Sequence, residues 1–122
     1  MTNHDPARSL PLSVPVHQIL LSLAAGERHG YAIIQDIRDR TAGEVDLTAS
    51  TLYGALSRML DDGAIEEVEA PEEGDARRRY YRITEEGRAV ARAEAGRLAR
   101  ALEQAMSQGL GPESASSGAG AR

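Results

Sequence analysis

The sequence predicts a mainly α-helical protein with one small β-hairpin, in the order helix, helix, helix, hairpin, long helix. Three observations support this fold class. Apolar residues recur at helical spacing in four segments. Two short strand-like segments, separated by a loop that contains Pro and Gly, lie between the third and fourth helices. The length of 122 residues suits one domain with a modest core, to which a long helix or a partner would add.

The spacing of aliphatic residues predicts the first two helices. The first would begin near Pro15 and end at Gly26, with an apolar stripe formed by Val16, Ile19, Leu20, Leu23 and Ala24. The second would follow Gly30 and end near residues 41–43. Its apolar positions are Tyr31, Ile33, Ile34 and Ile37.

The third helix is predicted from Ala49 to about Asp62, with Thr48 as its N-cap and Gly63 as its stop. Its inner face would carry Leu52, Leu56, Met59 and Leu60. Its opposite face is small and hydroxylated, and it carries Ser50, Thr51, Gly54, Ser57 and Arg58, with Tyr53 on the flank. Such a face suits the DNA major groove, because small residues allow close approach, hydroxyls bind phosphate or bases, and arginine reads guanine. The alternative is an ordinary solvated surface.

A β-hairpin is predicted directly after this helix. Its strands would span residues 64–69 and 78–83, and its loop would span residues 70–76. Tyr81 and Ile83 would face one side of the hairpin. The other side would carry Arg78, Tyr80 and Arg82. The hairpin, residues 64–83, is called the wing below.

The charge distribution bears on whether this protein binds DNA. The formal net charge is −5, and all 14 basic side chains are arginines. The second strand of the wing would present Arg77, Arg78, Arg79 and Tyr80 to flanking phosphates or to the minor groove. The acidic residues are expected to lie elsewhere, on an acidic body with a local basic edge, so that non-specific DNA affinity is weak. The alternative is that the arginines only make the wing soluble.

The fourth helix is predicted from Glu85 to about Gln108, with Thr84 as its N-cap. Its apolar stripe consists of Ala91, Ala95, Leu98, Leu102 and Ala105. A second copy of the chain is the simplest cover for this stripe, and the alanines would let two helices approach closely. Such a dimer would hold two recognition helices about 34 Å apart, as a pseudo-palindromic operator requires. The alternative is packing onto the first helix of the same chain.

Other function classes lack support in the sequence. There is no cysteine, and the three histidines are not at ligand spacing, so we expect no metal site and no cofactor. Glu66 and Glu67 are adjacent on a strand and would point in opposite directions, so they form no carboxylate dyad. No nucleophile motif is present, and we expect no enzymatic activity. Without a membrane-length apolar run or a secretory signal, a cytoplasmic protein is expected.

Three segments of the sequence resemble the PadR family of bacterial transcriptional regulators. They are ILLSLAAGERHGYAI (19–33), TLYGALSRMLDDGAIEE (51–67) and RRRYYRITEEGR (77–88). The resemblance covers about residues 16–107, and the single short helix after the wing resembles the smaller of two subfamilies. It implies a winged helix-turn-helix fold, a homodimer built through the C-terminal helix and, usually, repression of a nearby promoter.

By position, the resemblance assigns DNA contacts to Ser50, Thr51, Tyr53, Ser57 and Arg58 in the recognition helix and to residues 77–80 in the wing. His29-Gly30-Tyr31 matches an architectural turn of the family. Family members often have glycine where this chain has Ser50, and a longer side chain where it has Gly54, so operator preference is expected to differ. Family members respond to small aromatic compounds, but this chain has no Trp and no Phe for ligand stacking. The identity of any small-molecule effector is therefore not predicted.

The expected organisation is a flexible arm over residues 1–11, a winged helix-turn-helix DNA-binding domain over 12–84, a dimerisation helix over 85–108 and a disordered tail over 109–122. Two functions remain open from the sequence. The first is a homodimeric repressor that a small-molecule ligand releases from double-stranded DNA. The second is a winged-helix protein-interaction module that has lost DNA binding, which the acidic net charge favours.

Overall fold

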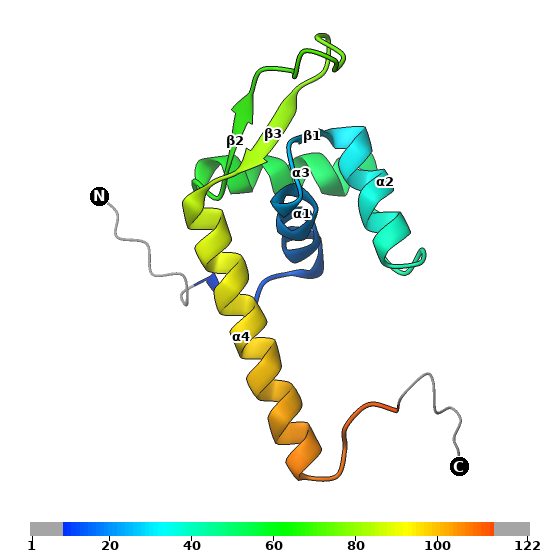
Figure 1. The fold of residues 1–122 in the computed structure, drawn as a ribbon, viewed down its shortest axis with the longest axis vertical. Coiled ribbons are helices and arrows are strands. Elements are labelled where there is room, and N and C mark those ends of the chain that lie inside the picture. The colour runs from blue at the N-terminus through cyan, green and yellow to red at the C-terminus, as the bar shows by residue number, and fades with distance from the viewer. Residues whose placement is uncertain (1–8, 114–122) are drawn as a thin grey trace.

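The structure is a computed structural model that describes residues 9–113 (Figure 1). Most of the predicted N-terminal arm and of the predicted tail lies outside these residues. The elements are α1 (Val14–Ala24), β1 (Arg28–His29), α2 (Gly30–Arg40), α3 (Ala49–Asp61), β2 (Ile65–Val68), β3 (Tyr80–Ile83) and α4 (Glu85–Ser107). The predicted fold class is confirmed, with a third short strand in addition. None of the helices in the described part of the chain combines the length and apolar character that a membrane crossing requires.

All four helices begin at a side chain that accepts a hydrogen bond from a backbone N–H of the first turn. These N-cap residues are Ser13, His29, Thr48 and Thr84. Each cap satisfies a donor that the helix itself leaves unpaired, which is why the helices begin where they do. Thr48 and Thr84 confirm the two N-caps that the sequence predicted.

The core lies where α1, α2 and α3 meet under the sheet. It consists of side chains that are at most 5% exposed, among them Ile19, Leu20, Leu23, Ile33, Ile37, Leu52, Leu56, Met59, Ile65, Tyr81 and Ile83. The aliphatic stripes predicted for the three helices supply most of them. Tyr31 is an exception, because it is 57% exposed and belongs to the surface of α2. Its place in the predicted stripe was wrong, since the buried side chains of α2 are those of Ile33 and Ile37, beside the buried Gly30.

The sheet has three antiparallel strands in the order β1-β3-β2, rather than the two that were predicted. Arg28 of β1 pairs with Tyr81, and His29 pairs with Tyr80. A strand of two residues has no alternation to detect, so the sequence carried no signal for it. Strand β3 also begins two residues later than predicted, which places Arg78 and Arg79 in the loop before it.

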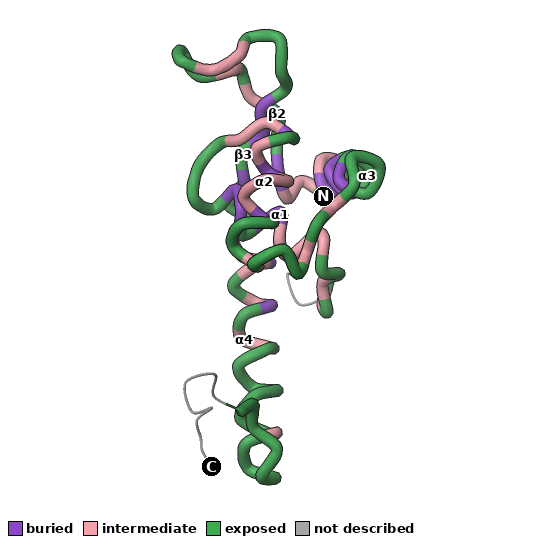
Figure 2. The backbone as a smooth tube through the Cα atoms, turned by 90° about the vertical axis from the view of Figure 1, so that its right-hand side faces the viewer, coloured by how far each residue is buried: buried purple, intermediate pink, exposed green. Residues whose placement is uncertain are grey.

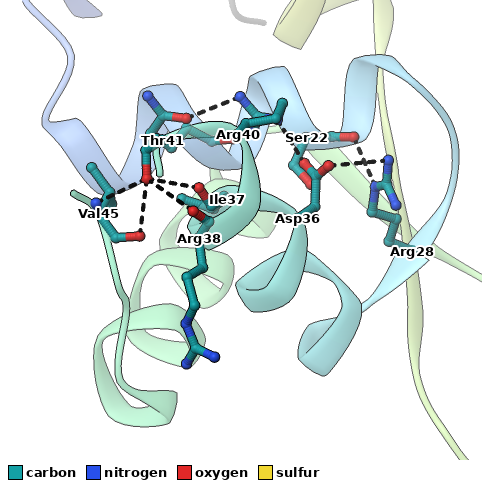
Figure 3. Close-up of polar contacts among 9 residues, drawn as sticks. Ser22, Arg28, Asp36, Ile37, Arg38, Arg40, Thr41 and Val45 are labelled. Atoms are coloured by element: carbon teal, nitrogen blue, oxygen red, sulfur yellow. Dashed lines mark hydrogen bonds and ion pairs between the residues drawn. The ribbon is translucent and has the colours of Figure 1, made fainter. Parts of the chain in front are cut away.

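A polar network on the outer side of the core joins α1, β1 and α2 (Figure 3). The Asp36 carboxylate pairs with Arg40 at 2.8 Å and with Arg28 at 3.6 Å. The Nε of Arg28 also donates to the Ser22 carbonyl at 3.1 Å. Burial by itself raises the pKa of Asp36, but hydrogen bonds from Arg40 and Ser22, with the charges of Arg28 and Arg40, lower this pKa below its ordinary value. The network ties the start of the sheet to the two helices beneath it.

Helix α4 has two halves with different surroundings (Figure 2). In the first half, Gly87, Val90 and Glu94 are buried, and the helix packs on α1 and β3. The Glu94 carboxylate is 3% exposed, pairs with Arg97 at 2.8 Å and accepts a bond from the Leu12 backbone N–H at 3.5 Å. The second half extends away from the body and is mostly exposed. Packing onto the first helix therefore accounts for only part of the predicted stripe.

The start of α4 is held tightly against the turn between α3 and β2. Gly63, with a φ of +80°, ends α3, and its carbonyl accepts a hydrogen bond from the Thr84 hydroxyl at 2.6 Å. The Thr84 backbone N–H donates to the Ala64 carbonyl at 3.0 Å. A Cβ at Gly87 would collide with that same carbonyl and lie 2.9 Å from the Ile83 Cγ1. Glycine at position 87 is therefore what allows α4 to lie this close.

We predict that Gly87→Ala destabilises the protein by about 2 kcal/mol, because the added methyl group has no space against the Ala64 carbonyl. The measurement is urea unfolding followed by circular dichroism. Gly96→Ala is the matched control in the same helix, since its Cβ would meet only the flexible Arg100 Nη1 at 3.4 Å. The control should be neutral or stabilise by up to about 1 kcal/mol. Equal effects of the two substitutions would contradict the prediction.

Candidate nucleic-acid interface

The outward face of α3 is small, polar and exposed. All five predicted contact residues in this helix are exposed, and they are Ser50, Thr51, Tyr53, Ser57 and Arg58. The opposite face is anchored by Leu52, Ala55, Leu56 and Met59, which are at most 2% exposed. Figure 2 shows α3 end-on at one side of the molecule, buried toward the body and exposed on its outer side. The helix therefore presents a rigidly backed surface to a macromolecular partner.

Two features modulate the charge of this face. Arg58 forms no ion pair within residues 9–113, so its guanidinium is available to an external anion. Asp61, which was not predicted as part of the face, is exposed at the last position of α3 and shares the side of the helix that carries Gly54 and Ser57. A carboxylate there repels phosphate, so the surface suited to DNA ends at Arg58 and does not include Asp61.

The arginines of the wing are each paired with a carboxylate of the same chain. Arg77 lies 3.2 Å and Arg78 lies 3.4 Å from Asp75. Arg79 lies 3.9 Å from Glu67. The expectation that the acidic residues lie elsewhere was therefore wrong, because the turn of the wing and the pairing of β2 with β3 bring carboxylates beside the basic side chains.

Arg82 shows the same pairing on β3 itself. Its guanidinium binds Glu66 at 2.7 Å and Glu27 at 3.5 Å, and these two acids raise the pKa of Arg82 further. Glu66 lies directly across the ladder from Arg82. Cross-strand pairs of opposite charge stabilise a hairpin modestly. Arg82 therefore helps to join the wing to the loop before β1.

Tyr80 lies inside the wing rather than on its surface. The side chain is 6% exposed, and its ring packs edge-to-face on His29 with centroids 5.3 Å apart. Its hydroxyl accepts a hydrogen bond from the Asp75 backbone N–H at 3.1 Å. The sequence predicted Tyr80 on the same side of the strand as Arg78 and Arg82 and as a DNA contact, but the His29 ring packs against it there. The geometry gives Tyr80 the role of holding the wing loop in place.

A contact between α2 and the wing extends the basic edge of the molecule. The sequence did not predict this contact. The Arg78 Cζ lies 5.9 Å from the centroid of the exposed Tyr31 ring. The Tyr31 hydroxyl accepts a hydrogen bond from Gln35 at 3.0 Å. His29 lies beneath, and both burial and the positive charge of Arg78 lower its pKa. The neutral imidazole that results keeps Nδ1 free to accept the capping bond from the Ala32 N–H at 3.1 Å.

Tyr53 reaches from α3 to the first turn of α2. Its ring is 49% exposed, yet its hydroxyl end lies against Gly30, where a Cβ would stand only 2.8 Å from the Tyr53 Cζ. A cleft joins this side chain to the wing, and it is lined by His29, Gly30, Tyr53, Arg77, Arg78 and Arg79. The absence of a side chain at Gly30 therefore allows Tyr53 to take this position. The His29-Gly30-Tyr31 turn thus also positions a side chain of α3, in addition to shaping the backbone.

The predicted dimer stripe divides between the two halves of α4. Ala91 packs against the core of its own chain. Leu98 is 43% exposed and Leu102 is 45% exposed, while Ala95 is exposed and Ala105 is half-buried. Met106 and Leu110, which follow on the chain, are also exposed apolar side chains. Within residues 9–113, no group of three or more His, Asp or Glu side chains is arranged to hold a metal ion.

Comparison with known proteins gives a family match and similar structures. Residues 19–93 match the family model described as the transcriptional regulator PadR-like family. The crystal structure of a PadR family transcription regulator from Clostridium difficile R20291 has a TM-score of 0.67 to this chain. The two are 29% identical, and the match covers 81% of this chain and 100% of that one. The structure of Bacillus subtilis PadR in complex with operator DNA has a TM-score of 0.58 to this chain and is 22% identical to it. The match covers 66% of this chain and 46% of that one. At this identity the similarity concerns the fold alone.

A curated relative has also been found in Lysinibacillus sphaericus, under the name Uncharacterized protein X. It is 34% identical over 71 residues, which make up 58% of this chain. The matched segment spans 65% of that relative, slightly less than two thirds of its length.

We predict that Gly30→Ala displaces Tyr53 without unfolding the protein. The backbone at the start of α2 accepts alanine, but the added Cβ would also lie 3.2 Å from Cδ2 of the buried Leu52, so the free energy of unfolding should fall by about 1 kcal/mol. The half-exposed Tyr53 ring should move toward solvent and lose its NOE contacts to residue 30. Gly54→Ala is the control, because its Cβ would approach nothing nearer than Arg58 Nη1 at 3.8 Å. Unchanged Tyr53 contacts in Gly30→Ala would refute the prediction.

Proposed function

This chain belongs to the PadR-like family of transcriptional regulators, and on that premise we propose that it binds operator DNA as a homodimer and represses a nearby promoter. The observation that carries the proposal is the outward face of α3, which is small, hydroxylated and exposed. It ends in Arg58, which forms no ion pair with any other residue that the structure describes. Members of the family are regulators of transcription rather than enzymes. The proposed place of action is the cytoplasm, where bacterial promoters are accessible.

In this proposal α3 enters the major groove. Ser50, Thr51 and Ser57 have short hydroxylated side chains, so they can approach the bases and phosphates closely. Arg58 supplies a guanidinium group that can donate two hydrogen bonds at once. Tyr53 lies on the flank of α3 that faces the wing. The wing arginines Arg77, Arg78 and Arg79 lie beyond it and would bind the flanking phosphates. Tyr80 contributes indirectly, by anchoring the loop that carries them.

The proposed dimer is built through the second half of α4. Leu98 and Leu102 are one helical turn apart and exposed, on a helix that leaves the body of its own chain. Ala95 and Ala105 flank them and allow close approach. A second copy of this helix buries the stripe, and a two-fold axis gives each chain the same contact surface. The two copies of α3 would then face successive major grooves.

An effector that releases the repressor would act where α4 meets the winged helix. A cavity of about 100 Å³ lies there, and its lining includes the apolar Leu12, Val16 and Val90 and the charged Arg58 and Glu86. Its walls come from α1, α3 and α4, so an occupant would bear on the DNA-contacting helix and on the dimerisation helix together. The cavity is small, which limits the proposed effector to a compact molecule.

One observation favours the second candidate, a protein-interaction module without DNA binding. The wing contains four arginines and six carboxylates, for a net charge of −2. A surface of this charge repels DNA unless its arginines are released from their acidic partners. The two functions predict different effects of substituting Arg58 on DNA affinity. Arg58 is exposed and forms no ion pair within the described part of the fold.

We predict that Arg58→Ala weakens binding to operator DNA by about fivefold to a hundredfold, because the loss of one base or phosphate contact costs about 1–3 kcal/mol. The probe is the duplex immediately upstream of the protein's own coding region, in gel-shift titrations. Arg92→Ala removes the same charge from an exposed position on α4 and should leave the affinity nearly unchanged. Wild-type protein that binds no duplex at low salt would favour the protein-interaction module.

We also predict that Leu98→Glu or Leu102→Glu converts the dimer into folded monomers, since the charge would be buried between two apolar stripes. Light scattering measures the mass, and circular dichroism checks the fold. Gln104→Glu adds the same charge on the other side of α4 and should remain dimeric. A Leu98→Glu protein that still has the mass of a dimer would show that the interface lies elsewhere.

A further inference from the structure

The wing neutralises its own positive charge, and one residue is responsible for most of this at the loop. Asp75 is the partner of two arginines at once, whereas Glu67 and Glu66 each hold one. The two arginines that it holds, Arg77 and Arg78, lie at the end of the wing and not in a strand. Arg77 has a side chain that is 91% exposed, so nothing except Asp75 restrains it among the described residues.

The contact between Asp75 and Arg77 has the geometry with which a guanidinium binds a phosphate. Arg77 Nε donates to Oδ1 at 3.2 Å, and Arg77 Nη2 donates to Oδ2 at 3.3 Å, so two parallel bonds join the planar groups. Arg78 Nε approaches Oδ2 from the other side at 3.4 Å. Hydrogen bonds from Arg77 and Arg78 lower the pKa of Asp75, so the carboxylate stays ionised at neutral pH.

The loop holds this carboxylate in place through its backbone. The Asp75 N–H donates to the Tyr80 hydroxyl at 3.1 Å, and Tyr80 is itself buried against His29. Asp75 Oδ1 also accepts the Arg77 backbone N–H at 3.0 Å, which closes a tight turn. The carboxylate is therefore built into the wing, directly beside the arginines that would meet the DNA backbone.

We propose that Asp75 is an internal competitor of DNA phosphate for Arg77 and Arg78, and that it restrains binding to DNA of any sequence. This inference rests on the proposed function. A phosphate oxygen that approaches either arginine must displace the Asp75 carboxylate, so each wing contact replaces an existing ion pair instead of adding a new one. Among the described residues 9–113, the contact that Arg58 would make from α3 meets no such competitor, because no carboxylate there forms an ion pair with it. Selectivity then depends on α3, while the wing adds little sequence-independent affinity.

The test is Asp75→Asn in the full chain, titrated against a random-sequence duplex over a range of salt concentrations. Asparagine keeps the Oδ1 that accepts the Arg77 backbone N–H, so the turn should survive while the charge is lost. We expect affinity to rise about fivefold to tenfold, and the slope of log affinity against log salt to steepen by about one, because the freed arginines release DNA counterions. The melting temperature should change little.

Glu73→Gln is the matched control. It removes one negative charge from the same loop, and Glu73 has no arginine partner within residues 9–113. We expect its affinity to change less than twofold. A second control repeats Asp75→Asn in a chain that also carries Arg77→Ala and Arg78→Ala, where the gain should vanish. Equal gains from Asp75→Asn and Glu73→Gln, no gain from Asp75→Asn, or a gain that persists without the two arginines would each overturn the inference.

A heparin column separates this inference from the proposed function. Heparin is a polyanion that needs no operator, so Asp75→Asn should elute at higher salt than the wild type and than Glu73→Gln even if no duplex binds. Absence of DNA binding by every variant, with the heparin shift present, would refute the proposed function and support the competition at Asp75. Identical elution of the three proteins would refute the competition.

Discussion

The close approach of α4 to the turn that ends α3 is the constraint on which the rest of the structure depends. Only glycine at position 87 lets the first turn of α4 lie against the Ala64 carbonyl, and the Thr84 hydroxyl bonds to Gly63 at 2.6 Å in the same place. A helix is stiff along its axis, so this contact sets the direction in which Leu98 and Leu102 leave the body. The surface proposed for DNA and the surface proposed for dimerisation are thereby held in one fixed relation.

One face of α3 stabilises the fold, and the other is the surface proposed for DNA recognition. Leu52 and Leu56 are at most 1% exposed, and their burial contributes on the order of 2 kcal/mol each to folding. Ser50 and Ser57, on the outward face, contribute almost nothing to the core. Substitutions on that face are free to alter operator preference while the helix stays in place. Gly30 links the faces, since it positions Tyr53 at the edge between α3 and the wing.

The pairing of the wing arginines reconciles an acidic protein with a family of DNA-binding regulators. A net charge of −5 means weak general attraction to a polyanion. Arg77 and Arg78 are screened by Asp75, and Arg79 lies beside Glu67. Ion pairs at an exposed surface are individually weak, so in the proposed complex a phosphate could displace them once α3 holds the wing beside DNA.

By itself, the sequence determined the four helices and their buried stripes, because helix caps and the 3.6-residue period are local signals. It also placed Ser50, Thr51, Ser57 and Arg58 on one outward face of the third helix. Only the tertiary structure decided the third strand, the burial of Tyr80 and the partners of the wing arginines. Strand β1 is too short to show a period, and Tyr80 is buried by His29, a residue 51 positions earlier. Such contacts depend on which distant segments the fold brings together. The spacing of residues along the sequence therefore does not predict them.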